Sequence, residues 1–569
     1  VICLKSGNGA GSHFKEAQDL IEIFENAKTF GSLIRVSEEL RSKLPAIAKL
    51  LEKKKTGDIF EQKDAEAVDV LLKQIEVLAN RYDCVVANPP YMGGKGMNSI
   101  LKEFAKTQYP QTKSDLFAMF IERGFEMAKD KTGYNAMVTM QSWMFLSSYE
   151  QMRQTMLNTA TIRAMVHMSN GVMGIAFGTC ATVWHNSKMV AYKGSFSYVD
   201  YADLNDENAP REFPLKNNRL KDASSNDFKK IPSSPIAYWV SENVRVVFEK
   251  AVCLSEIGTP RQGLATGDND QFRRNWAEVN YSKVGLCGYE NSKKWFPYNS
   301  GGEYRKWYGN QFYVVNWEQD GKAIRNCVDE TGSQKSRPQN TGYYFKPSIS
   351  WAKVTSGGLA MRYFPQGFIF DVAGCSIFTD SEDELIYLLG FFNSCLKEPL
   401  IASFCPTINF EVGQIANAPI LQNIDRKFKD KIITLVRQCI LLSRNDWDNH
   451  EYSWNYQGSP LLGKGQKKDL ANSYEQYRKD CCRMVESMSS LEQDNNGILI
   501  ETYGLQGEVV SAVPLDEVTL FANPKHRYKG ELSDSEREAR FKADSIKELI
   551  SYAIGCMMGR YSVDVPGLV

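Results

Sequence analysis

The feature that most constrains the fold is a short apolar segment that runs directly into two prolines. Residues 82–91 read Tyr-Asp-Cys-Val-Val-Ala-Asn-Pro-Pro-Tyr. The apolar, β-branched part predicts a buried strand, and Asn88 then stands where the carboxyl end of a parallel strand meets the crevice of an α/β sheet. Pro89 and Pro90 fix φ and lack backbone donors, so the carbonyl oxygens of the turn stay free to accept hydrogen bonds. The sequence therefore predicts a rigid acceptor site, with Tyr91 as a flat surface beside it.

The residues around this turn alternate between helical and strand patterns. Apolar residues recur at helical spacing in 63–80, and further helices are predicted at 99–106, from 113 onward and at 147–158. Residues 134–140, 162–168 and 181–184 read as strands. Ser114 or Asp115 is the predicted cap of the helix that begins near 113. The alternation predicts a Rossmann-like α/β sheet, in which a glycine-rich loop at 169–179 carries one large aromatic residue, Phe177.

The segment Asn88-Pro89-Pro90-Tyr91 after an apolar strand resembles the catalytic loop of S-adenosyl-L-methionine-dependent amino-group methyltransferases, above all the DNA adenine-N6 enzymes. The resemblance implies that the Asn88 side-chain oxygen and the Pro89 carbonyl accept hydrogen bonds from the amine of an extruded adenine. It also implies that Tyr91 stacks on the base and that Phe177 packs against it. The alternative for the tetrapeptide is an ordinary turn, and the alternative for Phe177 is a hydrophobic plug in its loop.

Composition limits where nucleic acid could bind. The chain has 569 residues, and its 68 Lys and Arg residues equal its 68 Asp and Glu residues, so a DNA-binding surface would have to be local. This length predicts roughly three or four domains. The 13 cysteines form no Cys-x-x-Cys pair, which predicts free thiols in a reducing bacterial or archaeal cytoplasm and no metal site. We find no apolar run long enough to span a membrane and no signal peptide.

The cofactor site is the part of the family pattern that the sequence does not supply. A glycine-rich stretch at 7–12 follows a predicted strand, but no second strand ends in an acidic residue at the interval of about 20 residues that a dinucleotide site requires. We interpret this stretch as a surface loop. The family's S-adenosyl-L-methionine motif, a strand ending in Asp-Pro-x-Cys-Gly-Ser-Gly, is not found. We expect that motif upstream of Val1, with Asn88 at the edge of the cofactor site.

The second half of the chain changes character. Residues 203–253 are predicted to be a linker and a docking helix, and residues 254–420, dense in aromatics, glycine and short alternating strands, form a β-rich domain. The segment 263–272 resembles the opening motif of target-recognition domains in single-chain restriction-modification methyltransferases, although any β-rich domain also uses many aromatics. Basic residues interleaved with planar ones predict DNA contacts. The candidates are Arg273, Arg274, Lys293, Lys294, Arg305, Lys306, Lys335, Arg337, Lys353 and Arg362.

Residues 421–569 are predicted to be mainly helical. Helices are expected at 428–444 and 474–492, a strand at 497–503, and a capping box at 533–536. An apolar stripe at helical spacing follows at 546–558, which we interpret as core, with a clamp over DNA or a docking face for a partner as the alternatives.

Taken in order, the catalytic loop, the Phe177 loop, the 263–272 motif and the terminal Met-Met-Gly-Arg-Tyr-Ser at 557–562 resemble the adenine-specific methyltransferases of BREX phage-defence systems. In that interpretation residues 1–202 are the second half of the methyltransferase domain. The resemblance implies a site-specific DNA adenine-N6 methyltransferase that marks self DNA at an asymmetric double-stranded site, with other BREX proteins as partners. The alternatives are an RNA or protein-glutamine amino-methyltransferase, which would use the same loop, and a non-catalytic DNA-recognition subunit.

Overall fold

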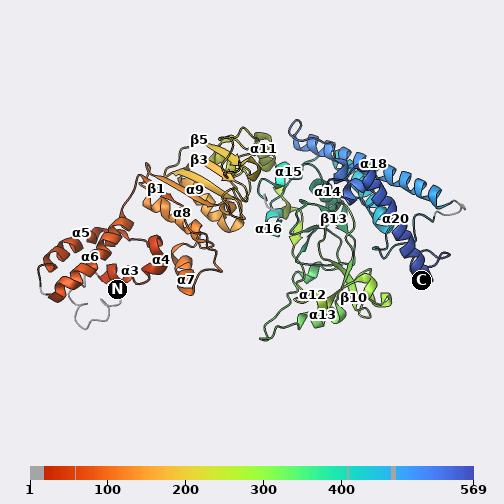
Figure 1. The fold of residues 1–569 in the computed structure, drawn as a ribbon, viewed down its shortest axis with the longest axis horizontal. Helices are drawn as coiled ribbons and strands as arrows, with labels where there is room; N and C mark the ends of the chain where they lie inside the picture. Colours follow the sequence, from red (N-terminus) through yellow and green to blue (C-terminus); the bar gives the residue numbers. More distant parts are fainter. Residues whose placement is uncertain (1–17, 58, 406–408, 463–468) are drawn as a thin grey trace. The chain divides into compact units, whose positions relative to one another are not determined.

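The computed structural model describes residues 18–57, 59–405, 409–462 and 469–569, and within it the chain forms two compact units that meet in sequence at Trp239 and Val240 (Figure 1). The predicted strand and glycine-rich loop at the start of the chain lie outside the described residues. Each unit has its own core.

Among the described residues of the first unit, four α-helices precede the sheet, and α5 and α6 lie side by side (Figure 1). Their apolar positions, such as Leu44, Ile47, Val68 and Ile75, recur at helical spacing and are buried in one shared core. The helix predicted at 63–80 is confirmed within α6. The bounds are α3 (Gln18–Ile23), α4 (Ala27–Phe30), α5 (Glu38–Lys54) and α6 (Ile59–Ala79).

A six-stranded mixed sheet follows, in the order β1-β2-β4-β3-β5-β6. β1 runs parallel to β2 and β3 parallel to β5, while β4 is antiparallel to both of its neighbours. The predicted Rossmann-like α/β sheet is confirmed. The strands are β1 (Cys84–Ala87), β2 (Tyr134–Met140), β3 (Thr161–Met168), β4 (Thr179–His185), β5 (Lys193–Val199) and β6 (Lys221–Ser224), and the helices among them are α7 (Ser99–Gln108), α8 (Leu116–Met127) and α9 (Glu150–Thr159).

The strand that leads to the predicted acceptor turn is the last strand of the sheet among the described residues. β1 pairs with β2 on one side only. Its Val86 side chain is 77% exposed, although valine in the strand of an α/β sheet is normally covered. The prediction of a strand is therefore confirmed, but the described residues do not bury it.

The boundary between the units corrects the predicted linker. Of residues 203–253, β6 and α10 (Ser225–Lys229) belong to the sheet unit, and Phe228 is buried in its core. The buried Arg153 guanidinium donates to the carbonyls of Trp143, Leu146 and Ser233, which holds this segment against α9. Low apolar content concealed this connection, which depends on a few apolar side chains such as Phe228 and on the backbone carbonyl of Ser233.

The second unit contains the β-rich region and the helices together. One four-stranded sheet has the order β14-β10-β11-β9, another has the order β13-β12-β15-β8, and β7 pairs with β16. The strands are β7 (Val252–Cys253), β8 (Thr259–Arg261), β9 (Arg273–Asn275), β10 (Trp295–Asn299), β11 (Tyr313–Asn316), β12 (Ser348–Ala352), β13 (Met361–Phe364), β14 (Ile369–Phe370), β15 (Gly374–Phe378) and β16 (Pro419–Ile420).

The helices of the second unit pack mainly on one another and on the second sheet, where α14 contacts both α17 and β13 (Figure 1). Predicted helices 428–444 and 474–492 are confirmed, as is the capping box of Ser533 and Glu536. The predicted strand at 497–503 is wrong, because those residues are the last turns of α18. The bounds are α11 (Glu242–Lys250), α12 (Asn269–Phe272), α13 (Glu318–Arg325), α14 (Glu382–Phe392), α15 (Lys397–Ile401), α16 (Val412–Ile415), α17 (Arg426–Asp448), α18 (Leu470–Tyr503), α19 (Pro524–Arg527) and α20 (Asp534–Met557).

Two further observations concern the described residues as a whole. None of their helices combines the length and the apolar character needed to cross a bilayer. All of their cysteines are free thiols.

Candidate active site and DNA interface

The acceptor turn is anchored at both of its ends. On one side it continues β1, whose Ala87 lies opposite Met137 of β2. On the other side the backbone N–H of Met92 donates to the Asp115 carboxylate at 2.9 Å, and Asp115 also caps α8 through the N–H of Phe117. Burial raises the pKa of Asp115. The predicted cap is confirmed, and the structure adds a role that local sequence could not show, since Asp115 fixes where the turn ends.

Within the turn, the two predicted acceptors differ in exposure. Asn88 is exposed, while Pro89 is buried and Tyr91 half-buried. The Tyr91 hydroxyl lies 3.5 Å from Asn88 Oδ1 and 3.4 Å from the carbonyl oxygen of Val138. Among the described residues no donor reaches the Pro89 carbonyl oxygen. Burial raises the pKa of the Tyr91 hydroxyl, which therefore stays protonated at neutral pH.

The structure brings Phe177 to Tyr91. Their ring centroids are 5.7 Å apart with an interplanar angle of 67°, and Tyr91 also meets Phe117 edge-on at 6.1 Å. Phe177 comes from the loop between β3 and β4, so the fold alone places it beside the turn. The two rings are in direct edge contact, which means that a planar ligand would pack on their open sides rather than between them.

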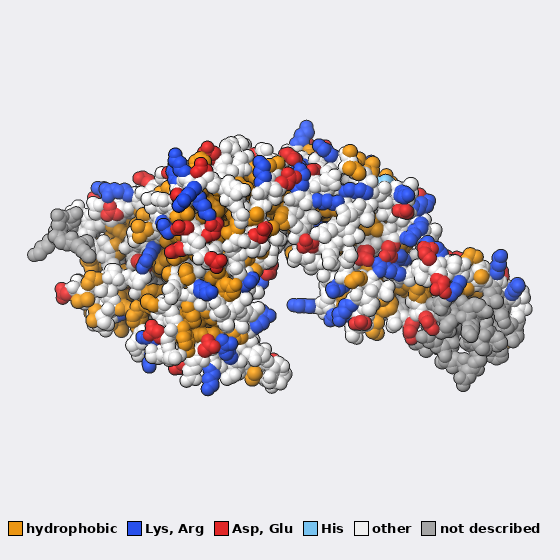
Figure 2. All heavy atoms as spheres, turned by 180° about the vertical axis from the view of Figure 1, so that it is seen from behind, with side chains coloured by type: hydrophobic (Ala, Val, Ile, Leu, Met, Phe, Trp, Pro, Cys, Tyr) orange, Lys and Arg blue, Asp and Glu red, His pale blue; other side chains and the backbone are white. Residues whose placement is uncertain are grey.

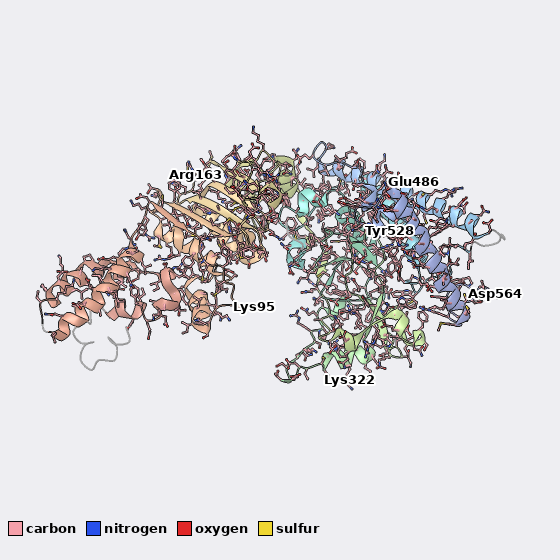
Figure 3. The ribbon with its side chains drawn as sticks, in the orientation of Figure 1. Lys95, Arg163, Lys322, Glu486, Tyr528 and Asp564 are labelled. Carbon is pink, nitrogen blue, oxygen red and sulfur yellow. The ribbon has the colours of Figure 1, made fainter. Side chains whose placement is uncertain are left out.

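Residues 92–96, which follow the turn, form a closed turn of their own. The N–H of Gly94 donates to the Ser114 carbonyl and the N–H of Gly96 donates to the Gly93 carbonyl. Lys95 in this segment is exposed and is labelled at the edge of the first unit in Figure 3.

In the second unit, the 263–272 segment packs closely against β14. A Cβ atom at Gly263 would lie 1.9 Å from the carbonyl oxygen of Phe370, so the segment can lie against β14 only with glycine there. Asp268 caps α12, and its carboxylate is 3.4 Å from Lys335 Nζ. Arg337 pairs through its backbone with Ala265. The fold therefore places Lys335 and Arg337 beside the predicted motif.

Seven of the ten predicted DNA contacts remain at least partly exposed. Arg273 and Arg274 lie on β9, where Arg273 covers the Tyr313 ring at 4.4 Å. Lys353 is held by Glu411 at 3.0 Å. On the face shown in Figure 2, basic and acidic side chains are interspersed, in keeping with the balanced composition. The seven are Arg273, Arg274, Lys293, Lys294, Lys335, Arg337 and Lys353.

The other three candidates, Arg305, Lys306 and Arg362, are buried, which corrects the prediction for them. Arg305 pairs with Asp446 of α17 at 2.8 Å, and Lys306 pairs with Glu492 of α18. Burial lowers the pKa of Lys306, and the Glu492 carboxylate more than offsets this, leaving the pKa above its usual value. Both side chains therefore pair with carboxylates of the protein itself and are not part of an exposed surface.

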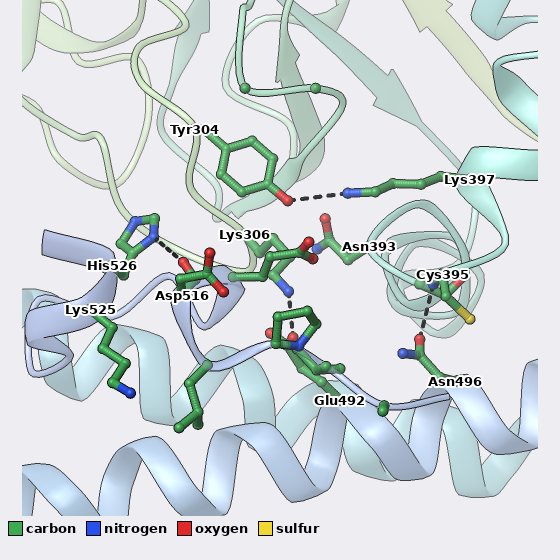
Figure 4. Close-up of a pocket in the computed structure, with 18 of the residues that line it drawn as sticks. Tyr304, Lys306, Asn393, Cys395, Lys397, Glu492, Asn496, Asp516, Lys525 and His526 are labelled. Carbon is green, nitrogen blue, oxygen red and sulfur yellow. Dashed lines mark hydrogen bonds and ion pairs between the residues drawn. The ribbon is translucent and has the colours of Figure 1, made fainter. Parts of the chain in front are cut away.

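The pair of Lys306 and Glu492 borders a cavity of about 950 Å³ inside the second unit (Figure 4). Tyr304 and Lys397 lie on its wall, with the Lys397 ammonium donating to the Tyr304 hydroxyl at 3.1 Å.

The third buried candidate, Arg362, donates to the carbonyls of Gly301 and Arg305. Burial, with the nearby Arg305, lowers the pKa of Arg362 to about 10. Basic residues next to aromatic residues in the sequence therefore occur in the interior of this unit as well as on its surface.

Comparison with known proteins finds a matching family model and similar methyltransferases. The Eco57I restriction-modification methylase family matches residues 13–173. The chain is 38% identical over 571 residues to the adenine-specific methyltransferase BrxX of Escherichia coli O9:H4 (strain HS), a match that covers 99% of this chain and 45% of that protein. The chain is thus similar, over nearly its whole length, to part of a protein named as an adenine-specific methyltransferase.

A second relative and one solved structure extend the comparison. The adenine-specific methyltransferase PglX of Lacticaseibacillus casei (strain Zhang) is 33% identical over 574 residues, covering 97% of this chain and 46% of that protein. The chain thus spans under half the length of these two relatives. A structure of the Type IIL restriction-modification enzyme MmeI in complex with DNA overlaps 82% of this chain and 57% of that one, with a TM-score of 0.46 and 12% identity.

Proposed function

We propose that the chain carries the base-binding and sequence-recognising parts of a site-specific DNA adenine-N6 methyltransferase. The observation that supports this most directly is the pair of hydrogen-bond acceptors at the carboxyl end of β1. The Asn88 side chain is exposed, and the Pro89 carbonyl has no donor among the described residues. The relation to adenine-specific methyltransferases names a ligand with the matching chemistry, because adenine carries an exocyclic amine with two N–H donors.

In this proposal each group of the turn binds either the amine or the ring of the base, or holds a neighbouring group in place. The Asn88 Oδ1 atom and the Pro89 carbonyl oxygen accept the two N–H groups of the amine, which directs the nitrogen lone pair away from both oxygens. Pro90 keeps the Pro89 carbonyl in place because its ring restricts the backbone. Tyr91 and Phe177 pack against the base, which must leave the duplex to reach them. Neutral Tyr91 adds no charge that would have to be desolvated there.

The methyl donor that we propose is S-adenosyl-L-methionine, which supplies an electrophilic methyl group. The described residues fit only one edge of its site, at Asn88. Among the described residues, β1 pairs with β2 alone, and no further strand lies beyond it. We therefore assign no other cofactor-binding residue to the described part of the chain.

Sequence recognition is proposed for the second unit. Arg273, Arg274, Lys293, Lys294, Lys335, Arg337 and Lys353 are the exposed or half-exposed basic residues that remain after the three buried ones are removed. Such side chains neutralise phosphates, which gives affinity, while only those that reach base edges give specificity. We propose double-stranded DNA with an asymmetric site as the substrate, and a role in a BREX phage-defence system with other proteins of that system as partners.

The experiment compares methyl transfer with DNA binding in the natural protein that contains these residues. Incubated with labelled S-adenosyl-L-methionine, it should label duplex DNA, and sequencing of the product should place N6-methyladenine in one short motif. Asn88→Ala should abolish transfer with little effect on DNA affinity. Asn80→Ala, at another exposed asparagine, is the matched control and should be active. Labelling of RNA or protein with none of DNA would overturn the proposal, and equal loss of binding and transfer in Asn88→Ala would assign Asn88 a folding role.

A further inference from the structure

Gln141 is connected to the surroundings of the acceptor turn through β2 and the Phe177 loop, although no sequence pattern identified it. It follows β2 directly, three residues beyond Val138, whose carbonyl oxygen lies 3.4 Å from the Tyr91 hydroxyl. Its backbone N–H donates to the carbonyl of Gly178 at 3.0 Å, and Gly178 is the residue after Phe177. The fold therefore connects Gln141 to both rings of the proposed base site.

The Gln141 side chain is held in one place by two contacts. Its Oε1 atom lies 2.6 Å from His167 Nε2. On its other side it lies flat across Gly178, where an added Cβ atom would stand 2.4 Å from the Gln141 amide carbon. Glycine at 178 is thus needed for this packing, because any larger residue would displace the amide.

The orientation of the amide follows from a hydrogen-bonded chain behind it. His167 is buried, its ring stacks on Trp239 at 6.1 Å, and its Nδ1 lies 3.2 Å from the Tyr238 hydroxyl. The buried Tyr238 hydroxyl has no other acceptor among the described residues, so it donates to Nδ1. Burial keeps His167 neutral, so its one N–H is on Nε2 and donates to Gln141 Oε1. The NH2 group of Gln141 is therefore the end that faces away from His167.

We propose that the Gln141 amide donates a hydrogen bond to a ring nitrogen of the target adenine, and that His167 is the positioning residue that presents this donor. The inference rests on the proposed function and names a substrate contact of the same site. Adenine has acceptor nitrogens on both sides of its amine, at N1 and N7. Guanine carries a donor at N1 and an oxygen in place of the amine, so an NH2 group facing N1 would disfavour it.

The test uses duplexes in which the target adenine, once located by sequencing, is replaced by 1-deaza-, 3-deaza- or 7-deazaadenine. Each analogue keeps the amine and removes one ring acceptor. For the unsubstituted protein, one analogue should lower kcat/KM by about tenfold, the upper range for one hydrogen bond. Gln141→Leu should lower kcat/KM for adenine to a similar extent and lose the difference between adenine and that analogue.

Two variants of His167 separate positioning from simple packing. His167→Gln keeps a donor toward Gln141 Oε1 and should preserve the difference in kcat/KM between adenine and that analogue. His167→Leu should lose this difference. The contact is refuted if no analogue lowers kcat/KM of the unsubstituted protein, or if Gln141→Leu discriminates as well as the unsubstituted protein. The role of His167 is refuted if His167→Leu still shows a lower kcat/KM for that analogue than for adenine. Absence of methyl transfer to every DNA would instead refute the proposed function.

Discussion

The buried pair of Arg305 and Asp446 gives a prediction whose size follows from the structure. The two side chains are 5% and 2% exposed, and the Asp446 carboxylate also accepts the backbone N–H groups of Phe521 and Ala522 at 2.8 Å each. One carboxylate therefore joins the β-rich region, α17 and the segment before α19. Arg305 also lies over the Phe521 ring at 4.5 Å.

Asp446→Ala would leave the Arg305 guanidinium buried without a counter-charge and two backbone donors without an acceptor. Removal of one partner from a buried ion pair costs about 3–5 kcal/mol, so we expect the free energy of unfolding to fall by about that amount. The matched control is Asp430→Ala on the same helix. Asp430 pairs with Arg426 at 3.8 Å, and these side chains are 67% and 93% exposed, so its loss should cost no more than about 0.5 kcal/mol.

The assay is thermal unfolding of the full protein, monitored by calorimetry, together with hydrogen exchange of residues 519–523. Asp446→Ala should lower Tm by several degrees and deprotect this segment, while Asp430→Ala should do neither. If the two variants unfold alike, the pair does not hold the β-rich region to the helices. The interpretation of Arg305 as a purely internal residue would then fail.

Three further predictions concern pH, packing and DNA. Burial, with a smaller effect of nearby Arg219, lowers the pKa of His167 to about 3 from its model-peptide value of 6.5, so below pH 6.5 the unfolded chain binds a proton that the folded chain does not. Stability should therefore fall by about 2 kcal/mol between pH 6.5 and 5, and denaturant titration of His167→Gln should lack this part of the slope. Gly263→Ala should cost about 1–3 kcal/mol by overpacking against a backbone carbonyl, whereas Gly342→Ala, which meets no atom within 4 Å, should be near neutral in thermal unfolding. Replacing Arg273 and Arg274 by Ala should weaken DNA binding and reduce the slope of log K against log salt by up to about two, and an unchanged slope would remove both from the interface.

The sequence by itself determined the elements that depend on near neighbours. Two prolines after an apolar strand define the turn at Asn88 wherever they occur, because their effect on φ and on donors is local. Helical spacing located α6, α17 and most of α18, and Ser533 with Glu536 marked the start of α20.

Tertiary structure alone decided which side chains meet and which are buried. Lys306 finds its carboxylate 186 residues away in sequence, and no local pattern separates it from a surface lysine beside a tryptophan. Tyr91 and Phe177, like Gln141 and His167, meet because strand order brings distant loops to one edge of the sheet. The apolar stripe of α20, expected in the core, leaves Met557 and Met558 86% and 80% exposed. Periodicity fixes the face of a helix, whereas burial of that face depends on what packs against it.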